Sequence, residues 1–160
     1  MEPGAFDEKN IPPQETGRPS IGRLGDFDME YFKILPDEDG KTNSWLAMGQ
    51  ENCKNQRYFT VYGADNEKLG IIGVYDAADG QNITHTVVDP KYRGHGLAAA
   101  FKEKLMDELG LPFVTLTIDL ENTKSIRAAE KLPGIRKTSD QAYEQEFHKV
   151  KYEYEREKKR

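Results

Sequence analysis

The sequence has a single cysteine, Cys53, among its 160 residues. An internal disulfide therefore cannot form, and a reducing compartment is the simplest expectation. No apolar run approaches the roughly 20 residues that span a bilayer, and the N-terminus lacks the basic and apolar regions of a secretory signal. These absences predict a cytoplasmic protein that makes no contact with a membrane.

The sequence also has few histidines and cysteines, and its acidic residues outnumber its basic ones. The three histidines show no metal-binding spacing such as His-Glu-x-x-His, and one cysteine cannot supply Cys-x-x-Cys, so we expect no metal site. Cys53 has no activating base near it in the sequence, which disfavours a nucleophilic role. The net charge of −5 disfavours a nucleic-acid partner and suits a cationic one, such as an amine.

The rest of the composition suffices for one domain. Apolar residues make up 36% of the chain and aromatic residues 10%, which is enough for a single core at this length. Residues 1–27 combine prolines, glycines and charges with few apolar side chains, and this predicts a disordered arm. Residues 155–160 read as a charged tail, so residues 28–154 are expected to form the domain.

The first half of this domain is predicted to consist mostly of strands. Residues 29–35 alternate well enough for a first strand, and residues 45–48 favour a short helix. Residues 57–62 and 69–75 flank a turn-like Asp-Asn-Glu-Lys segment and predict an antiparallel hairpin. Residues 82–88 supply a further strand.

The second half is predicted to alternate helices and strands. Residues 96–109 place leucine and phenylalanine at steps of four, which is typical of a helix with one buried face. Residues 113–118 are β-branched and apolar, as in a central strand, and Asn122 can cap the helix that follows. Residues 150–154 alternate as a last strand. This order predicts an α/β or α+β domain with a mixed sheet.

One stretch joins a strand end to a helix start through a glycine-rich turn. Residues 93–98 read Arg-Gly-His-Gly-Leu-Ala and follow the strand end and proline of residues 87–90. Glycines let the backbone approach a ligand, and the helix start adds its positive end. The turn therefore predicts a diphosphate site, although its spacing is neither that of a P-loop nor that of the dinucleotide fingerprint.

This turn resembles the acyl-CoA-binding motif Arg/Gln-x-x-Gly-x-Gly/Ala of the GNAT superfamily of N-acetyltransferases. Residues 121–134 are similar to the Asn-x-x-Ala/Ser helix that follows in the family, and the resemblance spans residues 56–134. It implies a GNAT-like fold with mostly antiparallel N-terminal strands, central splayed strands and two principal helices. It also implies acetyl-CoA as the cofactor.

The resemblance assigns the cofactor site residue by residue. It implies that backbone groups of Val87 and Val88 pair with the pantetheine arm like an added strand. It places Asn122 and Ser125 against the cofactor from the second helix, although Asn122 can equally be a plain helix cap. The residues implied to hold the diphosphate are those of the turn, namely Arg93, Gly94, His95, Gly96, Leu97 and Ala98.

Catalytic residues are harder to assign, because Ala129 stands where many family members carry the tyrosine that protonates the leaving thiolate. His85, on the strand before the turn, could take a proton from an ammonium if its pKa is near neutrality. Tyr143 could lend a hydroxyl, as could Tyr152 and Tyr154. A structural role stays open for each of these residues.

These observations predict an acetyl-CoA-dependent N-acetyltransferase that acts by direct transfer on a primary amine of a small molecule, peptide or protein. The missing tyrosine leaves open a non-catalytic sensor or interaction module that binds acyl-CoA without turnover. A monomer or a homodimer is expected. The segments expected to select the acceptor lie around Trp45 and Cys53 and in residues 135–147, and they carry no motif.

Overall fold

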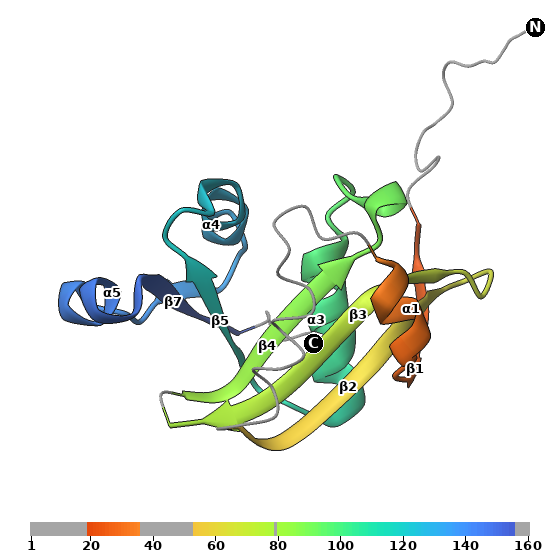
Figure 1. Cartoon of the computed structure of the whole chain (residues 1–160), viewed down its shortest axis with the longest axis horizontal. Coiled ribbons are helices and arrows are strands. Elements are labelled where there is room, and N and C mark those ends of the chain that lie inside the picture. The colour runs from red at the N-terminus through yellow and green to blue at the C-terminus, as the bar shows by residue number, and fades with distance from the viewer. Residues whose placement is uncertain (1–18, 36–52, 79, 156–160) are drawn as a thin grey trace, which may run out of the picture.

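The computed structural model describes residues 19–35, 53–78 and 80–155, which form one mixed sheet with helices on its faces (Figure 1). The described strands run in the spatial order β1-β2-β3-β4-β5-β7-β6. Neighbours are antiparallel except β4 and β5, which are parallel. The strands are β1 (Ile21–Asp26), β2 (Lys54–Gly63), β3 (Lys68–Ala77), β4 (Gly80–Val88), β5 (Val114–Asp119), β6 (Ile135–Lys137) and β7 (Lys149–Tyr154).

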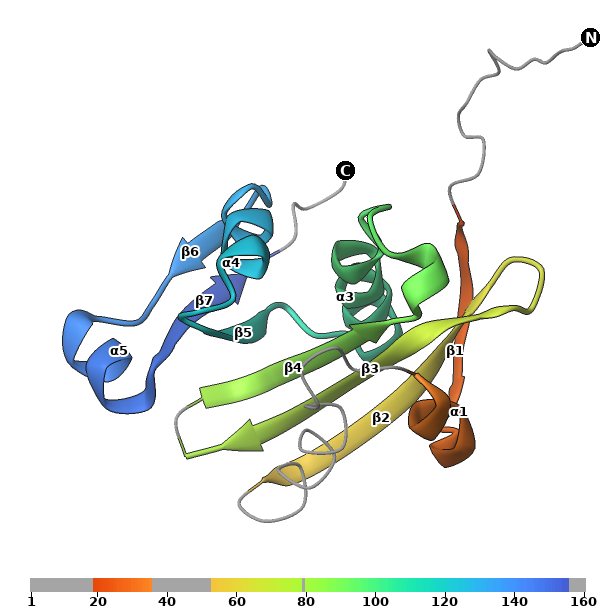
Figure 2. The same ribbon diagram turned by 45° about the horizontal axis from the view of Figure 1, so that its top comes forward.

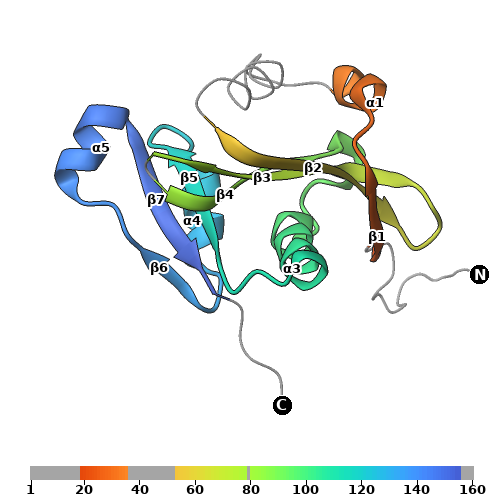
Figure 3. The same ribbon diagram turned by 90° about the horizontal axis from the view of Figure 1, so that it is seen from below.

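Helices cover the two faces of the sheet. The helices are α1 (Met29–Ile34), the 3-10 turn η1 (Pro90–Tyr92), α3 (Leu97–Leu109), α4 (Thr123–Glu130) and α5 (Gln141–Phe147). Figure 3 shows α1 on one side of β2 and β3 and α3 on the other. Leu97, Phe101 and Leu105 of α3 are buried in the larger apolar cluster. None of the helices in the described part of the chain is long and apolar enough to cross a membrane.

Most of the predicted elements are confirmed. The predicted hairpin is the β2–β3 pair, and β4 and β5 include or overlap the strands expected at residues 82–88 and 113–118. Helix α3 begins after Gly96 and ends at Gly110, both in the left-handed conformation. Asn122 caps α4, and β7 contains the expected last strand. The mixed α/β sheet is therefore correct.

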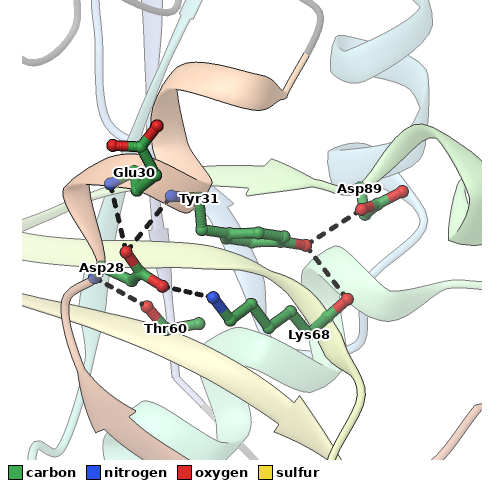
Figure 4. Close-up of polar contacts among 6 residues, drawn as sticks. All are labelled: Asp28, Glu30, Tyr31, Thr60, Lys68 and Asp89. Carbon is green, nitrogen blue, oxygen red and sulfur yellow. Dashed lines mark hydrogen bonds and ion pairs between the residues drawn. The ribbon is translucent and has the colours of Figure 1, made fainter.

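The first predicted strand is wrong, because Met29–Ile34 is the helix α1. The Asp28 carboxylate accepts hydrogen bonds from the backbone N–H groups of Glu30 and Tyr31, which caps the helix (Figure 4). Phe32 and Leu35 are buried with Tyr31, and this one-sided spacing is that of a helix. The helix expected at residues 45–48 lies outside the described residues.

The boundary predicted for the arm is also wrong. Residues 21–26 form β1, which pairs with β2 through Leu24 and Val61, for example. Ile21 and Leu24 are partly buried against the larger apolar cluster. These two side chains anchor a segment whose glycine content suggested disorder. Residues 1–18 and 156–160 lie outside the described residues, so the rest of the arm and most of the tail stay predictions.

Two short elements were not predicted, and both lie near β7. Strand β6 pairs with β7 through Ile135 and Tyr154. Helix α5 is capped by Asp140, whose carboxylate accepts the Tyr143 N–H at 2.9 Å. Figure 2 shows both elements at the end of the sheet farthest from β1. Strand β6 has three residues and α5 has seven, which are too few to show a clear apolar period in the sequence.

Candidate functional site

The candidate site begins where β4 and β5 separate. These parallel strands pair only at Ile83 with Thr115 and at Thr84 with Leu116. Beyond these pairs the strands diverge, and α4 follows β5 while the glycine-rich turn follows β4 (Figure 1). Among the described residues, residues 85–88 of β4 therefore pair with a strand on one edge only, and that strand is β3.

The hydrogen-bond pattern of β4 decides which backbone groups face this opening. The Asp89 N–H donates to the Leu69 carbonyl oxygen of β3 at 2.8 Å. Because antiparallel strands alternate between inward and outward backbone groups, those of Val87 face β3, while those of Thr86 and Val88 face the opening. The geometry therefore favours Thr86 and Val88 over Val87 for pairing with an extended ligand. Thr86 was missed, although it lies two residues before Val88 on the same edge.

The turn after β4 is shaped by two glycines. Gly94 and Gly96 have φ of +85° and +75°, and a Cβ at either position would meet nothing within 4 Å. Gly96 caps α3 without any side-chain hydrogen bond. The first N–H groups of this helix, from Leu97 on, therefore have no capping partner and sit at its positive end. This is the arrangement that binds a phosphate group.

The two side chains of the turn are held by nearby carbonyl groups. The Arg93 Nε donates to the Val88 carbonyl oxygen at 2.8 Å, and the His95 Nδ1 lies 3.1 Å from the Tyr92 carbonyl oxygen. Arg93 is exposed and His95 partly buried. Contact of Arg93, His95, Leu97 and Ala98 with a cofactor stays a prediction.

The start of the turn is fixed from the α1 side of the sheet (Figure 4). The Tyr31 hydroxyl lies 3.0 Å from both an Asp89 carboxylate oxygen and the Lys68 carbonyl oxygen, and can donate to either. Asp89 in turn accepts the Lys91 N–H at 3.0 Å, which caps η1. Lys68 also pairs with Asp28, the cap of α1. Helix α1 and the turn are thus tied together through Asp89.

Asn122 and Ser125 begin the second helix of the site. The Asn122 Oδ1 accepts the Ser125 N–H at 3.2 Å, so the side-chain oxygen is used as a helix cap. This confirms the capping role. Contact of either residue with a cofactor stays a prediction.

His85 does not have the near-neutral pKa that the base hypothesis requires. Its Nε2 lies 2.7 Å from the Tyr75 hydroxyl. Burial, together with the positive charges of Lys149 and Lys102, lowers the pKa of His85 to about 3. The imidazole is therefore neutral at physiological pH, and its pKa lies well below the range expected of a general base that works near neutrality.

The three candidate tyrosines lie in different surroundings. Tyr143 is on α5, where its ring stacks on Phe147 at 4.7 Å between centroids, and the Lys151 Nζ lies 4.9 Å from its centroid. Tyr152 and Tyr154 are buried on β7, and their side chains lie on the face of the strand opposite to that of Lys151. Their hydroxyls donate to Glu130 of α4 at 2.8 Å and to Glu103 of α3 at 2.7 Å, respectively. Burial and these carboxylates raise the pKa of both hydroxyls.

A group of possible metal ligands lies near the end of β5. Ligand atoms of Asp119, Glu121 and His148 lie within 4.8 Å of one another. Asp119 is partly buried and the other two are exposed, and such carboxylate groups are common on protein surfaces. This grouping could not be predicted from the sequence, because His148 follows α5 and lies far along the chain from Asp119 and Glu121. The expectation of no metal site stays untested.

Comparison with known proteins supports the assignment of the fold. Among solved structures, an acetyltransferase of the GNAT family from Bacillus anthracis is 19% identical, with a TM-score of 0.55 over 86% of this chain and 97% of that one. The N-acetyltransferase PseH from Campylobacter jejuni, solved with acetyl coenzyme A, is 11% identical, with a TM-score of 0.56 over 84% and 99%. The spermidine/spermine N-acetyltransferase SpeG from Vibrio cholerae, solved with manganese ions, is 14% identical, with a TM-score of 0.55 over 85% and 92%.

At these identities the solved structures speak for the fold alone, and no curated protein matches the chain. The sequence profile of the acetyltransferase (GNAT) domain matches residues 14–133, which is more than half of the 160 residues. The match runs through the turn, α3, β5 and α4. The chain therefore belongs to the GNAT acetyltransferase family.

Proposed function

We propose that this protein is an acetyl-CoA-dependent N-acetyltransferase that moves an acetyl group directly to a primary amine. The observation that carries the proposal is the turn at residues 93–98, whose two left-handed glycines follow the end of β4 that does not pair with β5. Its helix start suits the diphosphate, and the outward backbone groups of Thr86 and Val88 suit the amides of pantetheine. The thioester would then reach the point where the two strands separate.

The amine acceptor is supported by charge and by the neighbours. The net charge of −5 favours cationic acceptors over anionic ones. Two of the neighbours are N-acetyltransferases by name, one of them for spermidine and spermine. Direct transfer needs only that the amine and the thioester be held together, because proximity supplies much of the rate. A cytoplasmic location and a monomeric or homodimeric state stay part of the proposal.

The alternative is an acyl-CoA-binding module without turnover. It is favoured by Ala129, which is buried and occupies the position of the missing tyrosine. The two functions predict the same cofactor affinity. They differ in whether thiol is released when an amine is added.

Two measurements test the proposal in sequence. Calorimetry and thermal melting with CoA and acetyl-CoA should show binding, with a stabilisation of about 2.7 kcal/mol at a ligand concentration 100 times Kd. Pantetheine, which lacks the diphosphate, is the matched control and should bind far more weakly. Thiol release is then followed with acetyl-CoA and a panel of polyamines, amino sugars and lysine peptides. No CoA binding would refute both functions, whereas binding without release for any amine would favour the module.

A further inference from the structure

Lys102 is a buried cation with no anionic partner among the described residues. It lies on α3, and only 7% of its surface is exposed. Its Nζ is 3.2 Å from the Thr86 Oγ1 and 3.3 Å from the Ala98 carbonyl oxygen, both of which are uncharged. No carboxylate among the described residues forms an ion pair with it. A lysine is rarely buried without such a partner, because the charged form loses its hydration.

Its two contacts place the Lys102 ammonium between the turn and the opening. Ala98 is the last residue of the turn motif, and Thr86 lies beyond the last residue of β4 that pairs with β5. The same edge of β4 presents the outward backbone groups of Thr86 and Val88. A pantetheine arm that follows this edge from the turn carries its sulfur past Thr86. The Lys102 Nζ is therefore next to the path of the thioester.

The other proton donors considered from the sequence form hydrogen bonds elsewhere. The hydroxyls of Tyr152 and Tyr154 donate to carboxylates, which hold their protons more tightly. His85 is neutral and bonded to Tyr75. By contrast, burial lowers the pKa of Lys102 to about 8, so its ammonium can release a proton near physiological pH.

We propose that Lys102 is the catalytic acid that protonates the departing coenzyme A thiolate. This role rests on the proposed function. The acceptor nitrogen forms a bond to the thioester carbon, the carbon–sulfur bond breaks, and the sulfur leaves with the bonding electron pair. The Lys102 ammonium gives one proton to this sulfur and becomes a neutral amine. The proton that the acceptor nitrogen loses passes to solvent, and Lys102 is reprotonated from solvent.

Other titratable groups lie on the strands packed against α3, and His85 and Tyr75 among them lie on the opposite face of the sheet. The charges of Lys102 and of Lys149 of β7 both lower the pKa of His85 of β4. Among the described residues, no hydrogen bond or ion pair joins Lys102 to the rest of this set, so we expect Lys102 alone to cause a loss of kcat at alkaline pH. The set comprises Arg23 and Asp26 of β1, Lys68, Tyr75 and Asp76 of β3, and Tyr152 and Tyr154 of β7.

The test that needs no knowledge of the acceptor is the titration of bound CoA. The thiolate of CoA is followed by its ultraviolet absorbance as pH is raised, with protein in excess over CoA. A cation next to the sulfur should lower the thiol pKa by about 1 to 3 relative to free CoA in the wild-type protein. Lys102→Met should remove this effect while keeping CoA affinity. Lys104→Met is the matched control, since Lys104 is on the same helix and pairs with Glu108.

Lys102→Met should fold, because an apolar side chain of similar length suits a buried site, and its melting temperature should be no lower than that of the wild type. Lys102→Gln is a second variant that keeps hydrogen bonding to Thr86. With an active amine, both should lower kcat by roughly 10²-fold. Wild-type kcat should fall as pH rises above about 8, where Lys102 loses its proton, and both variants should lack this limb.

The outcomes separate the acid role from the proposed function. Equal thiol pKa values in the wild type and Lys102→Met, or an unchanged kcat, would overturn the acid role while the acetyltransferase stands. Loss of CoA affinity in both variants would instead make Lys102 a cofactor-binding residue and would also overturn it. A wild-type protein that binds no CoA would refute the proposed function itself, and the acid role with it.

Discussion

His85 and Lys102 approach the same opening from opposite faces of β4, and burial acts on them with opposite consequences. Thr86 points to Lys102 on the α3 side, so the neighbouring His85 points to the α1 side, where it meets Tyr75. Burial lowers both pKa values, to about 3 for His85 and to about 8 for Lys102. The histidine is thereby removed from proton exchange at neutral pH, while the lysine is brought into it.

This difference shows why residue type alone misleads. A histidine is the usual choice for a base because its ordinary pKa is near neutrality, and desolvation cancels that advantage. A lysine is rarely considered for proton transfer because its ordinary pKa is far above neutrality, and the same desolvation lowers that pKa toward neutrality.

The largest effect is expected from removal of β1, which supports the α3 face. Deletion of residues 1–26 removes Ile21 and Leu24 from the apolar cluster and leaves an edge of β2 unpaired. Loss of two such side chains costs about 3 kcal/mol or more, equivalent to a fall in Tm of about 10 °C for a domain of this size. Deletion of residues 1–18 keeps β1 and should leave Tm nearly unchanged. Equal melting of the two truncations would show that β1 adds nothing to stability.

Gly96→Glu should abolish CoA binding. It places a carboxylate at the start of α3, where the diphosphate is proposed to lie, in a backbone conformation that side chains rarely adopt. Gly110→Glu is the matched control, because Gly110 also has a positive φ, of +67°, with open space around its Cβ at the other end of α3. Both variants should lose similar stability. Calorimetry that finds CoA bound equally by both would rule out the turn as the diphosphate site.

Tyr31→Phe should have a smaller effect, on the α1 side. It removes the hydroxyl shared by Asp89 and the Lys68 carbonyl group, which should cost about 1 kcal/mol of stability in chemical denaturation. CoA affinity should fall a few-fold, because Asp89 caps the turn that precedes the glycines. Tyr62→Phe is the control, since the Tyr62 ring contacts Arg23 at 3.9 Å while its hydroxyl forms no hydrogen bond with the described part of the chain. Equal stability of the two variants would mean that the Asp89 network contributes nothing.

The parts of the site that sequence could predict are those formed by neighbouring residues. The glycines of the turn, the helix after them and the Asn122 cap each depend on a few consecutive positions, and the structure contains all of them. Turn chemistry and capping act over three or four residues, so they can be seen in the sequence alone. The acyl-CoA motif is of this kind.

The rest depends on contacts between distant residues. Helix α1 was predicted as a strand, although its Asp28 cap is local, because its burial depends on Ile71, which lies far along the chain. Lys102 carries no motif, and its burial follows from the packing of α3 against β4. The pKa of His85 depends, for the same reason, on its burial and on the charges of Lys149 of β7 and Lys102 of α3. Tertiary packing, which no local pattern encodes, decides these features.

The smallest effect at neutral pH is expected from His85 itself. Because its pKa is about 3 when folded and about 6.5 when unfolded, the unfolded chain binds a proton first as pH falls. The contribution of His85 to stability is therefore complete above about pH 6.5 and is lost as pH falls toward 3. His85→Gln should flatten this part of the pH dependence, while His148→Gln, at an exposed position, should not.

At pH 7.5 turnover of His85→Gln should change by less than about 10-fold, since a neutral imidazole that stays neutral carries no proton in the reaction. Measured by NMR, the His85 ring should show no titration between pH 8 and pH 5. A midpoint near 6.5, or a large loss of turnover with normal CoA affinity, would restore the histidine as the base and remove the contrast between the two faces of β4.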